Sequence, residues 1–125
     1  ALILREGTIP FLLMDGKVPV GFIWLDMFGA KSCFGHAVFF KNAWGSARLY
    51  GKQTFRQILS YRDSRGYLFD CIMGLMPVAN RLAWKCAIAS GASKVGVIQN
   101  ALFDADREES VDAVLTVVTR EILEM

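Results

Sequence analysis

Apolar residues in the first third of the chain fall into short runs that glycine and polar residues interrupt. Residues 11–14 and 18–27 are apolar and β-prone, and the Asp-Gly-Lys segment between them, 15–17, is typical of a hairpin turn. A third run, 33–40, is rich in aromatic residues and follows the glycine-containing connection 28–32. We therefore expect three successive strands, of which the first two are antiparallel.

The pattern changes to a helical period after residue 45. Between residues 46 and 61, small and apolar side chains recur every three or four residues, which predicts an amphipathic helix. The expected buried stripe of this helix consists of Ala47, Tyr50, Gly51, Thr54, Phe55, Ile58 and Leu59. The polar segment 62–66 is expected to end the helix.

A buried strand and a second helix are expected next. Residues 67–76 form a continuous apolar run that suits a buried strand, and Pro77 is typical of a first helical residue. The helix would extend through Ser90, because Gly91 then stops it. The side chains expected to face inward are Ala79, Leu82, Ala83, Cys86 and Ala87.

Two further strands are predicted near the end of the sequence. Residues 94–99 and 111–119 are β-prone and flank a polar loop, 100–110. The element order is then β-β-β-α-β-α-β-β, in one domain of the α/β (α+β) class that spans residues 1–125. A right-handed crossover would make the third and fourth strands a parallel pair, and open α/β sheets bind ligands at the carboxyl ends of such strands.

The composition suits a folded domain with a sizeable core. Apolar residues make up 54% of the chain and charged residues 21%. The apolar runs are far shorter than a membrane span, and Arg5 and Glu6 interrupt the apolar opening of the sequence. We therefore expect no membrane partner and no signal peptide, and we place the protein in the cytoplasm.

Basic side chains concentrate between residues 41 and 85, whereas the chain from Asp104 onward is acidic. This asymmetry favours an anionic ligand near the middle of the chain, although solvated helix faces would produce the same pattern. The basic stretch lacks the exposed aromatic platform and the recognition motif of a nucleic-acid reader. Nucleic acid is therefore not an expected partner.

No metal site is expected from the chemistry of the side chains. Cys33, Cys71 and Cys86 lack the paired spacing of a zinc site or a redox dithiol, and we interpret them as reduced core residues. His36 is the only imidazole. The acidic run 104–109 lacks the glycine and the closing glutamate of a calcium loop, so we expect a solvated hairpin tip there.

The junction between the third strand and the first helix is a candidate anion site. Residues 42–47, Asn-Ala-Trp-Gly-Ser-Ala, form a turn of mostly small residues in which Gly45 lets the backbone approach a ligand closely. The first N–H groups of the following helix would point at a phosphate, and Arg48, Lys52 and Arg56 add positive charge along one side of that helix. A simple change of chain direction at Gly45 remains an alternative.

The element order and this junction resemble the GNAT superfamily of acyl-CoA N-acyltransferases, over about residues 11–119. The pyrophosphate turn of that family reads Gln or Arg, two variable residues, Gly, one variable residue, then Gly or Ala. Asn42, Gly45 and Ala47 occupy these places, and Asn42 is the one departure. The resemblance implies a mixed, mostly antiparallel sheet with one parallel β-α-β crossover at the ligand site.

A second pattern matches the late helix of the family. Asn80, Ala83 and Gly91 stand at the family's Asn, Ala and Gly positions, whereas Ala87 and Ala92 replace its tyrosine and phenylalanine. In the family, that tyrosine often serves as general acid toward the departing thiolate. Little of the strand and two helices with which members usually begin can fit before residue 11, so either the domain is pared down or residues are missing from the sequence. Short, motif-weakened members of this kind are similar to those found in bacteriophage and prophage genomes.

The resemblance implies an acetyl-CoA-dependent (or other acyl-CoA-dependent) N-acetyltransferase that acts on an amine acceptor. The alternative is a catalytically inactive GNAT-like module that binds CoA or another protein, as a homodimer through an exposed apolar strand or the carboxyl-terminal hairpin. The cofactor-binding residues implied are Val38, Phe40, Asn42, Trp44, Gly45, Ser46, Ala47, Arg48, Asn80 and Ala83. Trp44 would stack on adenine if its ring is exposed, and packing is its other interpretation.

Two residues are candidates for the general base that such a transfer needs. His36 is the first, because it lies on the strand that leads to the phosphate turn; a hydrogen-bonded structural histidine is the alternative. Asp70 on the neighbouring strand is the second, and an Asp paired with an Arg is the alternative. Asn80 would bind the pantetheine arm or cap the late helix.

Overall fold

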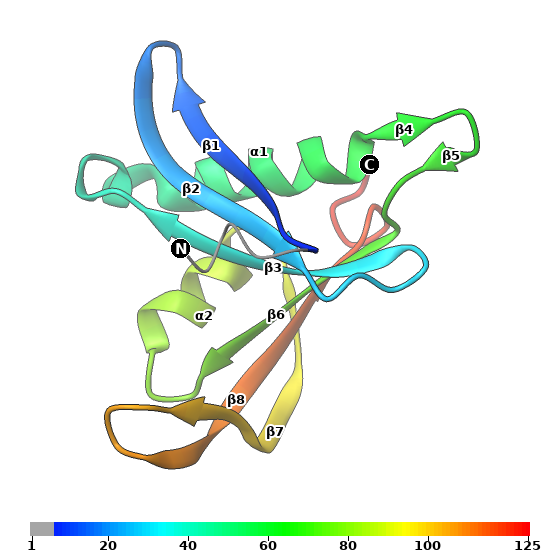
Figure 1. Cartoon of the computed structure of the whole chain (residues 1–125). Coiled ribbons are helices and arrows are strands. Elements are labelled where there is room, and N and C mark those ends of the chain that lie inside the picture. The colour runs from blue at the N-terminus through cyan, green and yellow to red at the C-terminus, as the bar shows by residue number, and fades with distance from the viewer. Residues whose placement is uncertain (1–6) are drawn as a thin grey trace.

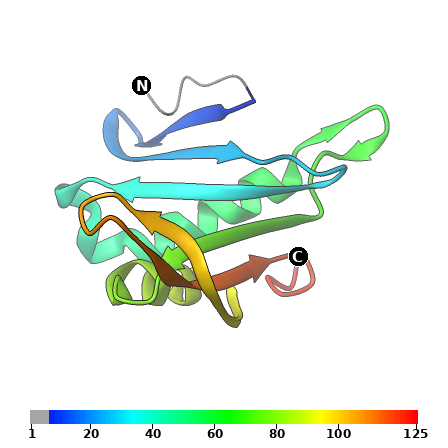
Figure 2. The ribbon, with the colours of Figure 1, turned by 60° about the horizontal axis from the view of Figure 1, so that its bottom comes forward.

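A six-stranded sheet with two α-helices on one face makes up the domain (Figures 1 and 2). The computed structural model describes residues 7–125; residues 1–6, including Arg5 and Glu6, lie outside this range. The sheet order is β1-β2-β3-β6-β8-β7. The strands are β1 (Ile9–Asp15), β2 (Val18–Asp26), β3 (Ser32–Phe39), β6 (Cys71–Pro77), β7 (Ser93–Asp104) and β8 (Glu109–Val118). The helices are α1 (Ala47–Ser60) and α2 (Arg81–Ala89), and a 3-10 helix, η2 (Lys41–Ser46), precedes α1.

The first two strands are antiparallel neighbours, as the sequence predicts, and the third strand is antiparallel to the second. Asp15 pairs with Val18, so that a two-residue turn joins β1 to β2. Gly16 occupies that turn with φ of +61°, a left-handed conformation that glycine adopts without steric cost. β2 then pairs with β3 along its length.

The parallel pair predicted from the crossover is also confirmed. Residues 32–34 of β3 pair with residues 71–73 of β6, and the two strands then diverge (Figure 1). Each strand keeps its antiparallel neighbour on the other side, because β2 pairs with β3 as far as Phe39 and β8 pairs with β6 as far as Pro77. The sheet therefore has two halves that are hydrogen-bonded to each other only at their base.

Helix α1 buries the stripe that its sequence period predicts. Gly51, Ile58 and Leu59 are buried, and the other four predicted positions are half-buried. Ile58 and Leu59 pack in the main core with side chains from the helix-facing side of the sheet, such as Leu25 and Val118. This stripe fixes α1 against the sheet and places its amino end beside the end of β3.

The strand after α1 is shorter than the sequence predicts. Residues 67–76 were expected as one strand, whereas β6 begins only at Cys71. The preceding residues form a separate two-stranded hairpin of β4 (Arg62–Asp63) and β5 (Gly66–Tyr67), in which the Arg62 guanidinium lies 4.5 Å from the centre of the Tyr67 ring. Apolar character alone does not reveal this break, because residues 67–69 are also apolar.

Helix α2 begins at Arg81 instead of Pro77, which corrects the predicted boundary. Pro77 is the last residue of β6 and pairs with Ala113. Asn80 is the N-cap, and its Oδ1 accepts a hydrogen bond from the Ala83 N–H at 3.3 Å. Because the helix starts later, Ala79 and Leu82 do not face inward, and 86% of Leu82 is exposed. Gly91 ends the segment with φ of +114°, as expected.

The predicted loop 100–110 is mostly strand. β7 and β8 extend through it, and only residues 105–108 form the turn. Register shifts in β7 and a left-handed Asn100 (φ +54°) bend this hairpin, so that its polar residues remain in solvent while the strands continue. The Asp104 carboxylate accepts hydrogen bonds from the N–H groups of Asp106 and Arg107, which confirms the hairpin tip.

Arg120, just after β8, joins three parts of the chain. Its Nη1 donates to the carbonyl oxygens of Leu59, at 2.9 Å, and Phe69, at 2.7 Å. Its Nη2 donates to the carboxylate of Asp70, and the guanidinium lies 3.8 Å from the centre of the Tyr67 ring. The end of α1, the β5–β6 connection and the carboxyl-terminal segment are therefore held by one side chain.

Two further observations, on membrane-spanning helices and on metal-ligand clusters, apply to residues 7–125 only. No helix within residues 7–125 is long and apolar enough to cross a membrane. In that same range, no group of three or more His, Cys, Asp or Glu side chains is placed to hold a metal ion.

Candidate active site

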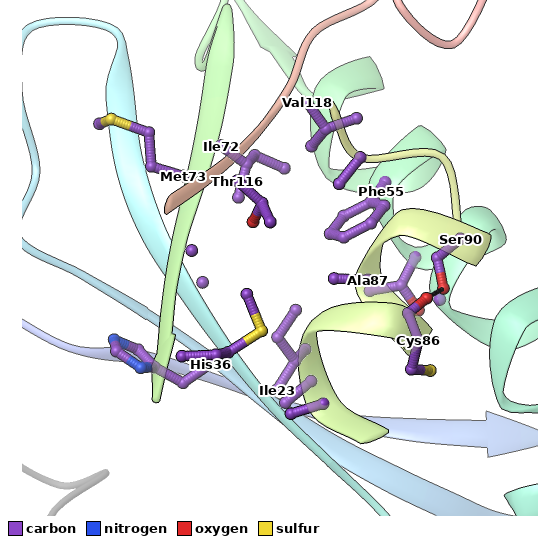
Figure 3. Close-up of a pocket in the computed structure, with 18 of the residues that line it drawn as sticks. Ile23, His36, Phe55, Ile72, Met73, Cys86, Ala87, Ser90, Thr116 and Val118 are labelled. Carbon is purple, nitrogen blue, oxygen red and sulfur yellow. Dashed lines mark hydrogen bonds between the residues drawn. The ribbon is translucent and has the colours of Figure 1, made fainter. Parts of the chain in front are cut away.

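A cavity of about 340 Å³ lies where β3 and β6 separate. This volume suits a small ligand or part of a larger one. Its wall takes residues from β3 and β6 and from both helices, and β8 contributes Thr116 and Val118 (Figure 3). The cavity lies at the carboxyl ends of the parallel pair, which is where the topology leads us to expect a ligand.

Peptide groups of β3 line one edge of the cavity. The Phe40 N–H donates to the Val20 carbonyl at 2.9 Å, so the peptide groups in phase with Phe40 are directed at β2. Because these groups alternate in direction along a strand, those of Gly35, Ala37 and Phe39 are directed at the gap. β6 does not pair with β3 at these residues. The edge can therefore hydrogen-bond an extended ligand.

Two glycines leave space around the cavity that a larger side chain would fill. A Cβ atom at Gly35 would lie 3.2 Å from Cγ2 of Ile72, and one at Gly74 would lie 2.8 Å from Oγ1 of Thr116. Both glycines line the cavity. A larger residue at Gly74 would displace Thr116, which is buried, and would fill space at the mouth of the gap.

The helix side of the cavity is mainly apolar, and the hydroxyl groups that the helical segments contribute, those of Thr54 and Ser90, are hydrogen-bonded to main-chain carbonyls. α1 contributes Phe55 and Thr54, and the Thr54 Oγ1 donates to the Tyr50 carbonyl at 2.7 Å. Ser90, just after α2, donates to the Cys86 carbonyl at 2.8 Å. A ligand on this side would therefore meet mainly carbon atoms.

His36 lies on the other side of the sheet. Figure 3 shows its imidazole directed away from the helices, and Met73 extends on that same side. The His36 Nε2 lies 2.8 Å from Oδ1 of Asp26, and the ring stacks on Trp24 with centroids 5.1 Å apart and 15° between the planes. Trp24 and His36 are direct cross-strand partners, so the sheet itself holds the two rings together.

Residues whose side chains lie on both faces of the sheet contribute to the cavity wall. Phe55 and Ala87 lie on the helix side, whereas the side chains of Trp24, His36 and Met73 lie on the opposite side.

Comparison with known proteins identifies this architecture through structure and not through sequence. No protein-family model matches the chain, and no curated protein sequence does. A Thermus thermophilus protein assigned as an acetyltransferase is similar in structure, with a TM-score of 0.75 and 19% identity over 96% of this chain and 63% of that one. The microcin C7 self-immunity acetyltransferase MccE, in complex with acetyl-CoA and AMP, has a TM-score of 0.73 and 14% identity over 91% of this chain and 62% of that one.

A third similar structure is the spermidine N-acetyltransferase SpeG of Vibrio cholerae in complex with CoA and spermine. Its TM-score is 0.71, with 14% identity over 96% of this chain and 70% of that one. The chain has the GNAT fold. It spans less than two thirds of the length of MccE and of the Thermus thermophilus protein.

Within the GNAT fold, the late helix supplies two of the predicted cofactor-binding residues to the cavity. Asn80 and Ala83 both line it. The Asn80 side chain caps α2, so the capping interpretation holds for its Oδ1. Ala87 also lines the cavity, and its methyl group can neither donate nor accept a proton.

The predicted phosphate turn is a 3-10 helix that leads directly into α1. The sequence predicted a turn of mostly small residues here, whereas the structure forms regular 3-10 turns in which Gly45 does not have a positive φ. A Cβ atom at Gly45 would meet no heavy atom of the described residues within 4 Å, so the space beside it is open. Trp44 is 66% exposed as a residue, while its Nε1 donates to the Phe39 carbonyl at 3.0 Å.

The segment 42–48 is next to the cavity but does not line it. Phe39 is the last residue of β3 and part of the cavity wall, and η2 begins two residues later. The predicted site residues in this segment are Asn42, Trp44, Gly45, Ser46, Ala47 and Arg48. The Asn42 side chain donates to the Pro19 carbonyl at 3.4 Å, which ties η2 to β2.

Three further predicted residues do not line the cavity. Val38 is exposed on the face opposite the helices, and the Phe40 N–H is used by β2. Asp70 precedes β6, at the end where β3 and β6 are still paired, and its carboxylate bonds Arg120. Asp70 is therefore paired with an arginine, which was the alternative to a role as general base.

The cysteines are unpaired thiols within the sheet and helices. Cys33 is completely buried, and burial is the main cause that raises its pKa to about 12. Burial also raises the pKa of Cys71. Because the thiolate is the reactive form, these two residues are poor nucleophiles at neutral pH.

Asp26 and Trp24 are the site residues that sequence reasoning missed. The contacts of Asp26 and Trp24 with His36 depend on the register of β2 against β3. The sequence of the irregular connection between these strands does not reveal that register. The available signal was the position of Asp26 as a single carboxylate at the end of an otherwise apolar run.

Proposed function

We propose that this chain is an acyl-CoA-dependent N-acyltransferase whose thioester lies in the gap between β3 and β6. The observation that carries the proposal is the cavity at this divergence, which is lined by residues from both sheet faces and lies next to the amino end of α1. MccE and SpeG, which share the fold, were solved with acetyl-CoA and with CoA. Acetyl-CoA is therefore the first ligand to test.

The donor would occupy the helix side of the gap. The peptide groups of Gly35 and Ala37 offer hydrogen bonds to the amides of the pantetheine arm, as one strand does to another. Ala83 and Ala87 leave room for that arm between α2 and the sheet. The apolar wall would keep water from the thioester.

The phosphates and the adenine would lie at the amino end of α1. The open space beside Gly45 lets a phosphate approach the backbone, and the helix dipole and Arg48 favour negative charge there. The exposed ring of Trp44 offers a surface on which adenine can stack.

The acceptor amine would attack from the face that carries His36. Its nitrogen forms a bond to the thioester carbonyl carbon, His36 accepts the proton that the amine loses, and the carbon–sulfur bond breaks to release CoA. Peptide N–H groups at the gap can stabilise the oxyanion. Ala87 supplies no acid, so the thiolate takes its proton from solvent or from the protonated His36.

A second candidate function is a GNAT-fold module that binds CoA or another copy of itself without turnover. Two observations favour it. Ala87 stands where the family tyrosine would be, and the β7–β8 hairpin exposes Val95, Val97 and Phe103. A binding measurement and a turnover measurement on the same protein separate the two candidates.

The test is calorimetric titration of acetyl-CoA and of free CoA into the intact chain and into Gly45→Glu. The glutamate would place negative charge in the proposed phosphate site and should weaken binding at least tenfold. Gly96→Glu is the matched control, because a Cβ at Gly96 also meets no described atom within 4 Å and lies on β7. No binding by the intact chain would sink the proposal, as would equal losses in both variants.

A further inference from the structure

The face of the sheet opposite the helices carries a continuous apolar and aromatic surface. Among residues 7–125, no helix covers this face of β1, β2, β3 and β6 (Figures 1 and 2). Cross-strand pairing places its side chains in register, and we call the set the open face: Pro10, Leu12, Phe22, Trp24, Asp26, Ser32, Phe34, His36, Val38, Cys71, Met73 and Leu75. These side chains surround the gap on the side from which His36 faces it.

The open face carries very few ionisable side chains. Asp26 is its only carboxylate among the described strand residues, and no Lys or Arg belongs to the set. The Asp26 and His36 side chains are 29% and 33% exposed, so both are reachable from solvent. The surface therefore offers one anionic point within an apolar field, which complements a single positive charge on an apolar body.

The aromatic side chains lie where such a body would rest. The Phe22 and Trp24 rings are 6.1 Å apart and tilted by 46°, and Trp24 stacks on His36. Phe34 and Met73 are direct partners across the base of the gap. A cation near these rings also gains from their electron-rich faces.

Asp26 also determines which nitrogen of His36 is free. A carboxylate accepts hydrogen bonds, so the Nε2 that faces it carries the proton in the neutral ring. The lone pair is then on Nδ1, which is the nitrogen that can take a proton from an amine. Asp26 thus acts on the reaction through the orientation of His36.

From these observations we propose that the acceptor is a monoamine with an apolar, preferably aromatic, body, bound on the open face. Its ammonium group is received beside Asp26 and His36, and its body lies on Trp24, Phe22 and the Phe34–Met73 pair. A polyamine is a poor fit, because its additional charges have no carboxylates to meet in this set. Acetyl transfer to this amine rests on the proposed transferase function, whereas the binding of the amine to the open face does not.

The experiment measures acetyl transfer and amine binding separately. Thiol release from acetyl-CoA is followed with phenethylamine, hexylamine, spermine and a peptide with a free amino terminus. Calorimetry of the same amines is carried out with and without saturating CoA. We expect kcat/KM and affinity to be at least tenfold higher for phenethylamine than for spermine or the peptide.

Two variants locate the site. Asp26→Asn should weaken phenethylamine binding about tenfold and change the pH profile of kcat, since the orientation of His36 is altered. Trp24→Leu should raise KM for phenethylamine more than for hexylamine. Asp106→Asn is the matched control, because it removes the same charge at the exposed tip of the β7–β8 hairpin and should change neither value.

The outcomes separate this proposal from the one on which it rests. If acetyl-CoA binds but spermine or the peptide is the better ligand, the acceptor proposal is overturned and the transferase proposal stands. If phenethylamine binds in a manner that depends on Asp26 while acetyl-CoA does not bind, the transferase proposal is overturned and the amine-binding proposal stands. Equal binding of all amines, or equal effects of Asp26→Asn and Asp106→Asn, would also overturn it.

Discussion

At the scale of single residues, Arg120 carries more structural connections than any catalytic candidate. Its guanidinium donates to two main-chain carbonyls and to Asp70 while it stacks on Tyr67. Hydrogen bonds from charged donors are stronger than neutral ones, and both carbonyls would lose their donor in a truncated variant. Asp70 contributes less, because half of its side chain is exposed and water can replace the arginine.

We expect Arg120→Ala to lower the free energy of unfolding by about 2–4 kcal/mol. Arg120→Lys should lie between the variant and the parent, since lysine keeps the charge but loses the planar fork. Asp70→Asn should cost less than about 1 kcal/mol and leave acetyl transfer unchanged. Urea unfolding and thiol-release kinetics give these values. A large loss of turnover in Asp70→Asn at unchanged stability would restore Asp70 as a candidate base.

At the scale of elements, periodicity predicted α1 and the order of helices and strands along the chain, because burial repeats with a fixed period in each type of element. The start of α2 was wrong because Pro77 is compatible with two roles, a first helical residue and the last residue of a strand. The Asn80 cap decides between them only once its contact with Ala83 is seen. The Asp26–His36 pair could not be predicted, because a shift of one residue in the register of β2 would send Asp26 to the other face.

The packing of α1 against α2 depends on Gly51. A Cβ atom there would collide with the side chain of the buried Ser90. Alanine is the better helix former by about 1 kcal/mol, yet we expect Gly51→Ala to destabilise the protein by about 1–3 kcal/mol because the helices cannot approach. The double variant Gly51→Ala/Ser90→Gly should recover most of this loss. Thermal and urea unfolding measure both, and a more stable single variant would contradict the packing argument.

At the scale of the whole molecule, the sheet consists of two halves that pair only at residues 32–34 and 71–73. The helices connect these halves on one face. A ligand that bonds the gap edge of β3 would join them along the rest of their length. Ligand binding should therefore protect the sheet in a pattern that follows the alternation of β3.

This pattern can be measured by amide hydrogen exchange. Saturating CoA should slow exchange at Ala37 and Phe39, whose N–H groups are directed at the gap, by at least tenfold. Exchange at His36 and Val38, whose N–H groups are directed at β2, should change much less. The neighbouring residues serve as internal controls. Uniform protection along β3 would indicate general stabilisation and contradict ligand bonding at this edge.

The divergence of β3 and β6 has a kinetic consequence for the proposed reaction. A donor on the helix side and an acceptor on the open face would reach the gap from different sides, so neither would have to leave before the other arrives. Both can be present at once, and the acyl group can pass directly between them without a covalent stop on the protein. The rate would then depend on the concentrations of both substrates, as it does in a ternary-complex mechanism. CoA and the acylated amine could each leave on the side from which the donor and the acceptor arrived.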